Sequence, residues 1–232
     1  MKPKSVFIAG TDVGIGKTFA ACALLRALRA AGLRATGMKP VATACRPTPD
    51  GLRSDDALAL IAASDPKPDR YADCNPFAFE PRGLPQIATV EADEEVTLPP
   101  IEDAYDQIVD LHGDAIVVAG VGGWLTPISD ALRTNAIPQH LNLPVMLVVG
   151  LKPGCLNQAL LTARAIHADG CDLVGWIGNR IDPDLPNPKA ILAMLHRSLA
   201  VPCLGLLAHG VEPIAATTAL REAADAVGAL TP

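Results

Sequence analysis

The chain has 232 residues, of which half are apolar, and a formal net charge of −6 at pH 7. This length fits one large domain with a sizeable core, so residues 1–232 are predicted to form a single domain. The acidic balance provides no basic surface for nucleic acid or an anionic membrane, and a small, locally held ligand is expected instead. The longest apolar stretch, residues 143–151, is too short to span a bilayer.

Short β-branched runs alternate with longer Ala- and Leu-rich stretches of helical period along the chain. This alternation is typical of an α/β fold, with a mostly parallel β-sheet and helices on both faces. Strands are predicted over residues 5–9, 34–38, 115–119, 144–150, 173–178 and 202–206. Helices are predicted over residues 17–31, 54–63, 101–111, 129–140, 157–169, 188–199 and 217–227. Between residues 65 and 100 the periodicity fades, and a long irregular excursion from the sheet is expected.

The segment at residues 10–18 (GTDVGIGKT) follows the first predicted strand and opens the first predicted helix. Its glycines allow backbone N–H groups to turn toward phosphate oxygens, and the helix N-terminus adds the positive end of its dipole. Lys17 can reach the β- and γ-phosphates, and the Thr18 hydroxyl can ligate magnesium. The segment therefore predicts a P-loop. Five residues separate Gly10 from Gly16 instead of the usual four, so the loop is a variant.

The six cysteines are scattered without a C-x-x-C pair, and several stand in apolar runs. This pattern favours reduced thiols that pack as small hydrophobic groups in a cytoplasmic protein. The N-terminus turns polar within a few positions, and no signal peptide is expected.

Further segments follow the P-loop in a specific order. They are GMKPVA at residues 37–42, GLR at 51–53, DDA at 55–57, GVGGWLTP at 120–127, VVGLKPGCLN at 148–157 and GWIGN at 175–179. With these motifs the chain resembles dethiobiotin synthetase over nearly all of its length. The resemblance implies a ligase that uses ATP and Mg²⁺ to form dethiobiotin from 7,8-diaminopelargonate and CO2 or bicarbonate, through a carbamate and a carbamic-phosphoric anhydride. It also implies a homodimer in which the substrate tail is bound across the interface.

The resemblance further implies a role for each residue at a matching position. Catalytic roles are expected for Lys39, Lys17 and Thr11. The two lysines would act as fixed cations, which stabilise the charge on a transferring phosphoryl group. The residues expected to bind ATP and its magnesium ion are Gly14, Ile15, Gly16, Lys17, Thr18, Phe19, Asp56, Asn179, Arg180, Ala208, His209 and Gly210, with Thr18 and Asp56 as metal ligands. The residues expected to bind the diamine are Thr11, Asp12, Lys39, Thr43, Gly122, Gly154, Cys155 and Asn157.

Three positions leave alternatives open. Asp55 competes with Asp56, because acidic residues are favoured in the first turn of any helix. Glu212 is a second acidic candidate in the nucleotide site. Ala119 stands where the family has a glutamate that completes the magnesium shell, so the metal site has one carboxylate fewer.

Other functions use the same loop. A nucleotide-dependent switch of the partition type is one, although the extra early loop lysine of those ATPases is missing here. A catalytically weakened relative that binds nucleotide without efficient turnover is another, and Ala119 is the feature that favours it. An amidoligase would need a glutaminase domain, for which the chain is too short.

Overall fold

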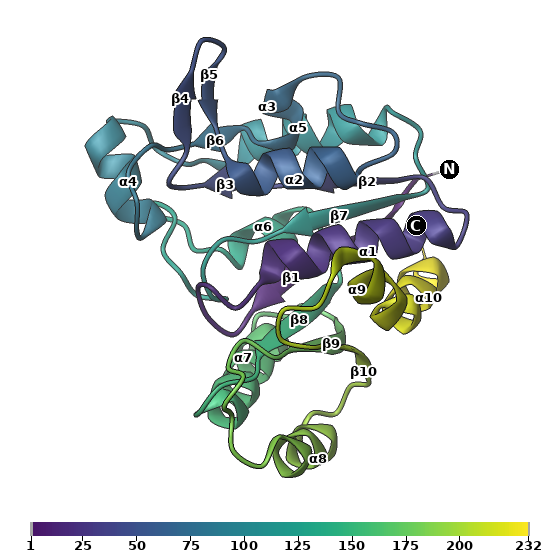
Figure 1. Ribbon diagram of the computed structural model, residues 1–232. Coiled ribbons are helices and arrows are strands. Elements are labelled where there is room, and N and C mark those ends of the chain that lie inside the picture. Colours follow the sequence, from purple (N-terminus) through teal and green to yellow (C-terminus); the bar gives the residue numbers. More distant parts are fainter. Residues whose placement is uncertain (1, 232) are drawn as a thin grey trace.

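The computed structural model describes residues 2–231 and is built around a six-stranded parallel sheet (Figure 1). The strand order is β10-β9-β8-β1-β7-β2. The strands are β1 (Lys4–Gly10), β2 (Ala35–Met38), β7 (Ala115–Ala119), β8 (Val145–Gly150), β9 (Leu173–Asn179) and β10 (Cys203–Leu207). All six predicted strands are present, and the predicted α/β class is confirmed.

Helices cover both faces of this sheet, as predicted. One face packs against α1 (Lys17–Ala30), α2 (Asp55–Ala63), α9 (Pro213–Ala219) and α10 (Arg221–Ala229). The other packs against α5 (Leu98–Val109), α6 (Ala136–His140), α7 (Cys155–Ala168) and α8 (Pro188–Ser198). Along β1, Val6 and Ile8 belong to the first layer and Phe7 to the second, because successive side chains of a strand alternate between faces. Burial on both faces explains why the strands read as continuous apolar runs.

Several short strands and helices lie on the β2 side of the sheet. Strand β3 (Val41–Ala42) pairs with β6 (Phe77–Ala78), and β4 (Arg46–Thr48) pairs with β5 (Gly51–Arg53) in a hairpin that projects from the body (Figure 1). The helices α3 (Tyr71–Cys74) and α4 (Pro85–Ala92) lie in the same part of the chain. Residues 65–100 therefore lie outside the six-stranded sheet, as expected, but the prediction of an irregular segment was wrong because they form short helices and a strand. Both α4 and α5 carry proline in their first turn, where its missing N–H costs no hydrogen bond.

Two predicted helices also differ from the structure. The helix predicted over residues 129–140 is restricted to α6. The segment before α6 is held in a non-helical form by side-chain hydroxyl groups: the Ser129 Oγ accepts from Leu132 N, and the Thr134 Oγ1 donates to the Val121 carbonyl. The helix predicted over residues 217–227 is two helices, α9 and α10, which meet at Leu220.

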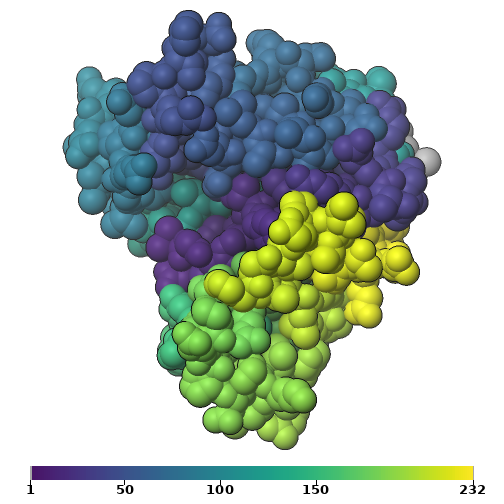
Figure 2. Space-filling view, viewed as in Figure 1, coloured from purple at the N-terminus to yellow at the C-terminus, as the bar shows by residue number. Residues whose placement is uncertain are grey.

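All six main strands are parallel, so their carboxyl ends lie at one edge of the sheet. The loops that leave this edge begin after Gly10, Met38, Ala119, Gly150 and Asn179. Ligands in open α/β sheets bind at this edge. In the space-filling view the purple N-terminal residues reach the surface between the blue and the green parts of the chain (Figure 2). Among the helices of the described residues, none is long and apolar enough to cross a membrane.

Candidate nucleotide and substrate site

The P-loop, residues 10–18, joins the end of β1 to the start of α1. Gly14 and Gly16 have positive φ angles of 69° and 85°, a region that glycine enters without steric cost. Gly16 is the N-cap of α1, and no side chain of the described residues caps this helix. The first N–H groups of α1 therefore lack side-chain acceptors, and such a helix N-terminus binds phosphate.

Asn179, at the carboxyl end of β9, holds the P-loop in place. Its Nδ2 donates to the Ile15 carbonyl at 2.8 Å, and the residue is buried. A Cβ atom added at Gly16 would collide with the same Nδ2 atom, so a larger residue there would have to displace the Asn179 side chain and also adopt a strained φ. The bond to Ile15 uses one of the two Nδ2 hydrogens, and the contact of Asn179 with the nucleotide base stays a prediction.

Lys17 and Lys39 bring two buried ammonium groups to the loop, from α1 and from the end of β2. The Lys17 Nζ donates to the Asp12 carbonyl at 2.7 Å. Burial, together with the charge of Lys39, lowers the pKa of Lys17 to about 7. The Lys39 Nζ lies 2.7 Å from Asp56 Oδ2, 3.2 Å from the Gly120 carbonyl oxygen and 3.5 Å from Thr18 Oγ1. These contacts gather the P-loop, β2, α2 and the end of β7 around one point.

The structure separates the roles of Asp55 and Asp56, which the sequence left open. Ser54 caps α2, with its Oγ accepting from Ala57 N, and the two aspartates occupy the first turn. Asp56 points inward to Lys39, whereas Asp55 points outward to Arg46, with 2.6 Å between Oδ1 and Nη2. Burial acts to raise the pKa of Asp56, but the charge and hydrogen bond of Lys39 outweigh it and hold that pKa below its usual value.

The residues at this point fit a nucleotide and a magnesium ion. Thr18 Oγ1 and Asp56 Oδ2 both contact the same Lys39 nitrogen, so these two oxygen atoms, which are suitable metal ligands, lie close to each other. Magnesium is commonly held by one or two protein oxygens, with phosphate oxygens and water completing its shell. Ala119 contributes only a buried methyl group, and the described residues contain no cluster of three or more His, Cys, Asp or Glu side chains that could hold a metal alone. Water, and phosphate oxygens when a nucleotide is bound, would complete the shell around these two oxygens.

Asp12 has charge partners that the sequence reasoning missed. Its Oδ2 accepts from Lys152 Nζ at 2.7 Å and from Gln158 Nε2 at 3.2 Å, and its Oδ1 accepts from Val13 N at 2.8 Å. The hydrogen bond from Lys152 is the largest contribution to a lowered pKa of Asp12. Lys152 stands two residues after β8, which neighbours β1 in the sheet, and this position at a strand's carboxyl end was the available signal. Thr11, also predicted here, accepts from Gly150 N at 3.4 Å.

The other residues predicted to bind the diamine, beyond Thr11, Asp12 and Lys39, occupy three segments. Gly122 has a φ of 63°, and a Cβ there would collide with Thr126, while its neighbour Gly123 lies against the backbone of Gly10 and Asp12. In α7, Gly154 is the N-cap, Cys155 is buried and Asn157 is exposed. Thr43, after β3, donates to the Gly83 carbonyl at 3.4 Å.

The remaining predicted residues, apart from Phe19, follow β9 and β10. The Arg180 N–H donates to the Leu207 carbonyl, and its Nη2 donates to the Pro183 carbonyl at 2.6 Å. Ala208, His209 and Gly210 follow β10 and are exposed. Phe19, in the first turn of α1, packs against the core on that face. Within residues 2–231, no hydrogen bond joins Thr43, Arg180 or residues 208–210 to a P-loop side chain.

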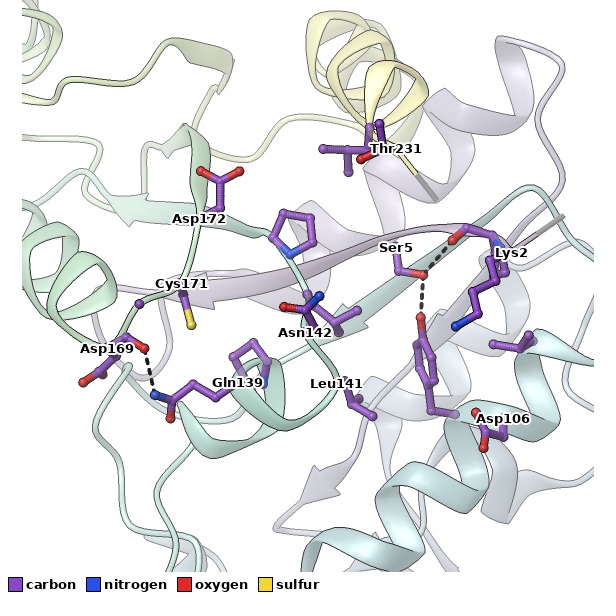
Figure 3. Close-up of a pocket in the computed structure, with 18 residues that line it drawn as sticks. Lys2, Ser5, Asp106, Gln139, Leu141, Asn142, Asp169, Cys171, Asp172 and Thr231 are labelled. Atoms are coloured by element: carbon purple, nitrogen blue, oxygen red, sulfur yellow. Dashed lines mark hydrogen bonds between the residues drawn. The ribbon is translucent and has the colours of Figure 1, made fainter.

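A large cavity of about 630 Å³ lies elsewhere, at the amino ends of the strands (Figure 3). It is lined by Ser5, Asp172 and Tyr105 among others, and none of the predicted site residues lines it. The Tyr105 hydroxyl donates to Ser5 Oγ at 2.7 Å, and Figure 3 shows the Gln139 amide bonded to the Asp169 backbone carbonyl. The cavity is therefore separate from the P-loop site at the carboxyl ends.

Comparison with known proteins decides the family. A family model described as an AAA domain matches residues 4–209. The ATP-dependent dethiobiotin synthetase BioD of Xanthomonas euvesicatoria pv. vesicatoria (strain 85-10) is 48% identical over 205 residues, which cover 88% of this chain and 91% of that protein. The chain belongs to the dethiobiotin synthetase family.

A second relative covers nearly the whole chain. The dethiobiotin synthetase BioD of Xylella fastidiosa (strain 9a5c) is 46% identical over 224 residues, 95% of this chain and 97% of that protein. The predicted family and the predicted class of ATP-dependent ligase are thereby confirmed. Among solved structures, the MinD cell division protein of Aquifex aeolicus matches 98% of both chains with a TM-score of 0.56 and 14% identity. That similarity concerns the fold alone.

Proposed function

We propose that this dethiobiotin synthetase family member joins 7,8-diaminopelargonate and CO2 at the expense of ATP, to form dethiobiotin, ADP and phosphate in biotin biosynthesis. The observation that carries the proposal is the meeting of Lys17, Lys39, Thr18 and Asp56 at the carboxyl edge of the sheet. A carbamate and a γ-phosphate are both anions, so their approach requires fixed cations, and two buried lysines supply them.

The reaction has three bond-forming steps. One substrate amine attacks CO2 and loses a proton, which gives a carbamate. A carbamate oxygen then attacks the γ-phosphorus, and ADP leaves. The second amine attacks the carbonyl carbon of the mixed anhydride, loses its proton and releases phosphate, so that the ureido ring closes. Lys17 and Lys39 stabilise the negative charge on the transferring group in the second step.

Different residues are proposed to hold the metal and the nucleotide. Thr18 and Asp56 would hold Mg²⁺, which when bound neutralises charge on the phosphate oxygens. The uncapped N-terminus of α1 with Gly14, Ile15 and Gly16 would receive the phosphates. Arg180 and residues 208–210 would line the base pocket, beside the exposed Glu212.

The diamine is proposed to lie near Asp12, Thr11 and Thr43, with its carboxylate tail at the N-terminus of α7. That N-terminus has Gly154 as its N-cap and exposes Asn157, and helix N-termini favour anions. Because this segment is exposed, the tail is proposed to come from a neighbouring subunit's site in a homodimer. Sedimentation as a monomer under assay conditions would remove the basis for the shared site.

The test is phosphate release from ATP and Mg²⁺, measured with and without diaminopelargonate and bicarbonate. Release that depends on the diamine is the expected result, with dethiobiotin as a product detectable by mass. Diamine-independent release, or none, would favour the nucleotide switch or the weakened relative.

An Ala119→Glu variant belongs in the same assay. Ala119 is the last residue of β7 and directly precedes Gly120, whose carbonyl contacts Lys39. A carboxylate there adds a hard oxygen ligand beside Asp56, and lower Mg²⁺ concentrations should then be sufficient for activity. If only the variant turns over the diamine, the weakened relative describes the natural chain.

A further inference from the structure

The Lys39 ammonium contacts both oxygens that are proposed to hold magnesium. Its Nζ is 2.7 Å from Asp56 Oδ2 and 3.5 Å from Thr18 Oγ1, and the Gly120 carbonyl accepts from it at 3.2 Å. Lys39 is only 4% exposed. The buried ammonium group of Lys39 therefore already satisfies the three oxygen acceptors that surround it.

The charges around these oxygens disfavour a second cation as long as the Lys39 ammonium group stays in place. Asp55 is turned away to Arg46, Ala119 ends in a methyl group, and Lys17 stands nearby with its Nζ bonded to the Asp12 carbonyl. Asp56 is the single carboxylate that contacts Lys39 within residues 2–231. A divalent ion on Asp56 Oδ2 and Thr18 Oγ1 would therefore lie beside an ammonium group without further anions to separate them.

The base of the Lys39 side chain is fixed while its tip is held only by these contacts. The Lys39 N–H donates to the Cys74 carbonyl at 2.7 Å, and the Lys39 carbonyl accepts from Asn75 Nδ2 at 2.7 Å. Asn75 is itself buried. The backbone therefore cannot move aside with the ammonium group, but the four-carbon side chain can rotate.

We propose that Lys39 and a divalent metal ion exclude each other at Asp56, so that metal entry displaces the ammonium group and directs it toward the phosphates. This inference rests on the magnesium site of the proposed function. It adds a coupling between metal binding at that site and the position of the Lys39 ammonium group. Lys39 acts as the competitor of the metal, and the binding of the metal makes its charge available to the transferring group.

The experiment measures Mn²⁺ binding to the nucleotide-free full chain by electron paramagnetic resonance. The protein is compared with a Lys39→Met variant, which keeps the length of the side chain and removes its charge. We expect Lys39→Met to bind Mn²⁺ at least about ten-fold more tightly, because the competing cation is gone. Unchanged or weaker binding by Lys39→Met would overturn the proposal.

The matched control is Lys17→Met. This variant removes one charge from the same site without removing a contact to Asp56 or Thr18. We expect a clearly smaller gain in Mn²⁺ affinity than for Lys39→Met. An equal gain would mean that general electrostatics and not displacement explains the result. The double variant Lys39→Met with Asp56→Asn should lose the gain, and retention of it would also contradict the proposal.

A second measurement uses the unmodified chain, in case Lys39→Met does not fold. The side-chain ¹⁵N resonance of Lys39 should shift as Mg²⁺ is added, with the same midpoint as metal binding. A resonance that stays unchanged at full metal occupancy would rule out displacement. Because neither measurement requires turnover, the displacement can fail while diamine-dependent phosphate release succeeds, and the reverse.

Discussion

The indole Nε1 of Trp124 donates a hydrogen bond of 2.7 Å to Oδ2 of Asp169, 45 residues further along the chain. The same Oδ2 accepts from Asn135 Nδ2 at 2.8 Å. Trp124 belongs to the loop after β7 that carries Gly122, and Asp169 is the C-cap of α7, which begins after Gly154. One carboxylate therefore fastens together two segments that are predicted to bind the substrate.

A Trp124→Phe variant removes the indole donor and leaves the ring, which also packs edge-on against Phe7. We expect a loss of about 1–3 kcal/mol in the free energy of unfolding, as is usual when a buried hydrogen bond partner is lost. The KM for the diamine should rise more than the KM for ATP. The loop that contains Trp124 also contains Gly122, which is predicted to bind the diamine, whereas ATP is predicted to bind at the separate P-loop. Urea unfolding and steady-state kinetics measure the two effects. Gln139→Ala, which removes an exposed bond to the Asp169 backbone carbonyl, is the control and should change little.

Asp55 and Asp56 offer a matched pair of substitutions in one helical turn. Asp56→Asn removes the charge that holds Lys39 and one predicted metal ligand, so phosphate release should fall by at least about ten-fold. Asp55→Asn breaks only an ion pair with Arg46 whose side chains are 63% and 78% exposed, and such pairs contribute little. Equal losses of activity in both variants would contradict the assignment of Asp56 to the site.

Gly16 and Gly14 provide a second pair. Both have positive φ, so an alanine at either position is strained by about 1 kcal/mol. Only at Gly16 would the new Cβ also collide, with Asn179 Nδ2, while nothing lies within 4 Å of a Cβ at Gly14. Gly16→Ala should therefore abolish ATP binding measured by calorimetry, and Gly14→Ala should weaken it only modestly. Comparable affinities in the two variants would show that Asn179 does not constrain the loop.

Buried thiols predict a dependence of stability on alkaline pH. Burial raises the pKa of Cys74 to about 12, whereas the thiol of the unfolded chain ionises near about 8.5. Between these values the unfolded state has lost the thiol proton and the folded state keeps it. The free energy of unfolding contributed by Cys74 is therefore unaffected below the lower pKa and falls as pH rises above it. A Cys74→Ala variant lacks this pH-dependent contribution to the free energy of unfolding.

Urea unfolding at about pH 8 and about pH 10 measures the effect. The loss of stability between the two pH values should be larger for the unsubstituted chain than for Cys74→Ala. Other groups that titrate in this range, including Lys17, are common to both proteins and cancel in the comparison. Identical losses would mean that the Cys74 thiol is not protected from ionisation by the fold.

The sequence by itself determined the strands, the P-loop and the family. These features are local: a β-branched run, a glycine-rich loop and a Lys-Thr pair carry their meaning within a few residues. All six strands of the main sheet were predicted for this reason. The region between residues 65 and 100 was not, because α3 is a single turn and α4 has only eight residues, which is too short for a clear apolar repeat.

Only the tertiary structure decided which side chains meet. The choice between Asp55 and Asp56 depends on how α2 is rotated against the end of β2, which packing sets. The contact between Asp12 and Lys152 joins residues that are 140 positions apart, and it exists because β1 and β8 are neighbours in the sheet. Lys39 reaches Asp56, Thr18 and Gly120 because β7 lies between β1 and β2 in the sheet and α2 packs against β2. Each of these side chains stands at a chain position that local pattern identifies, but the distances between them follow from strand order and helix packing, which act between residues far apart in the sequence.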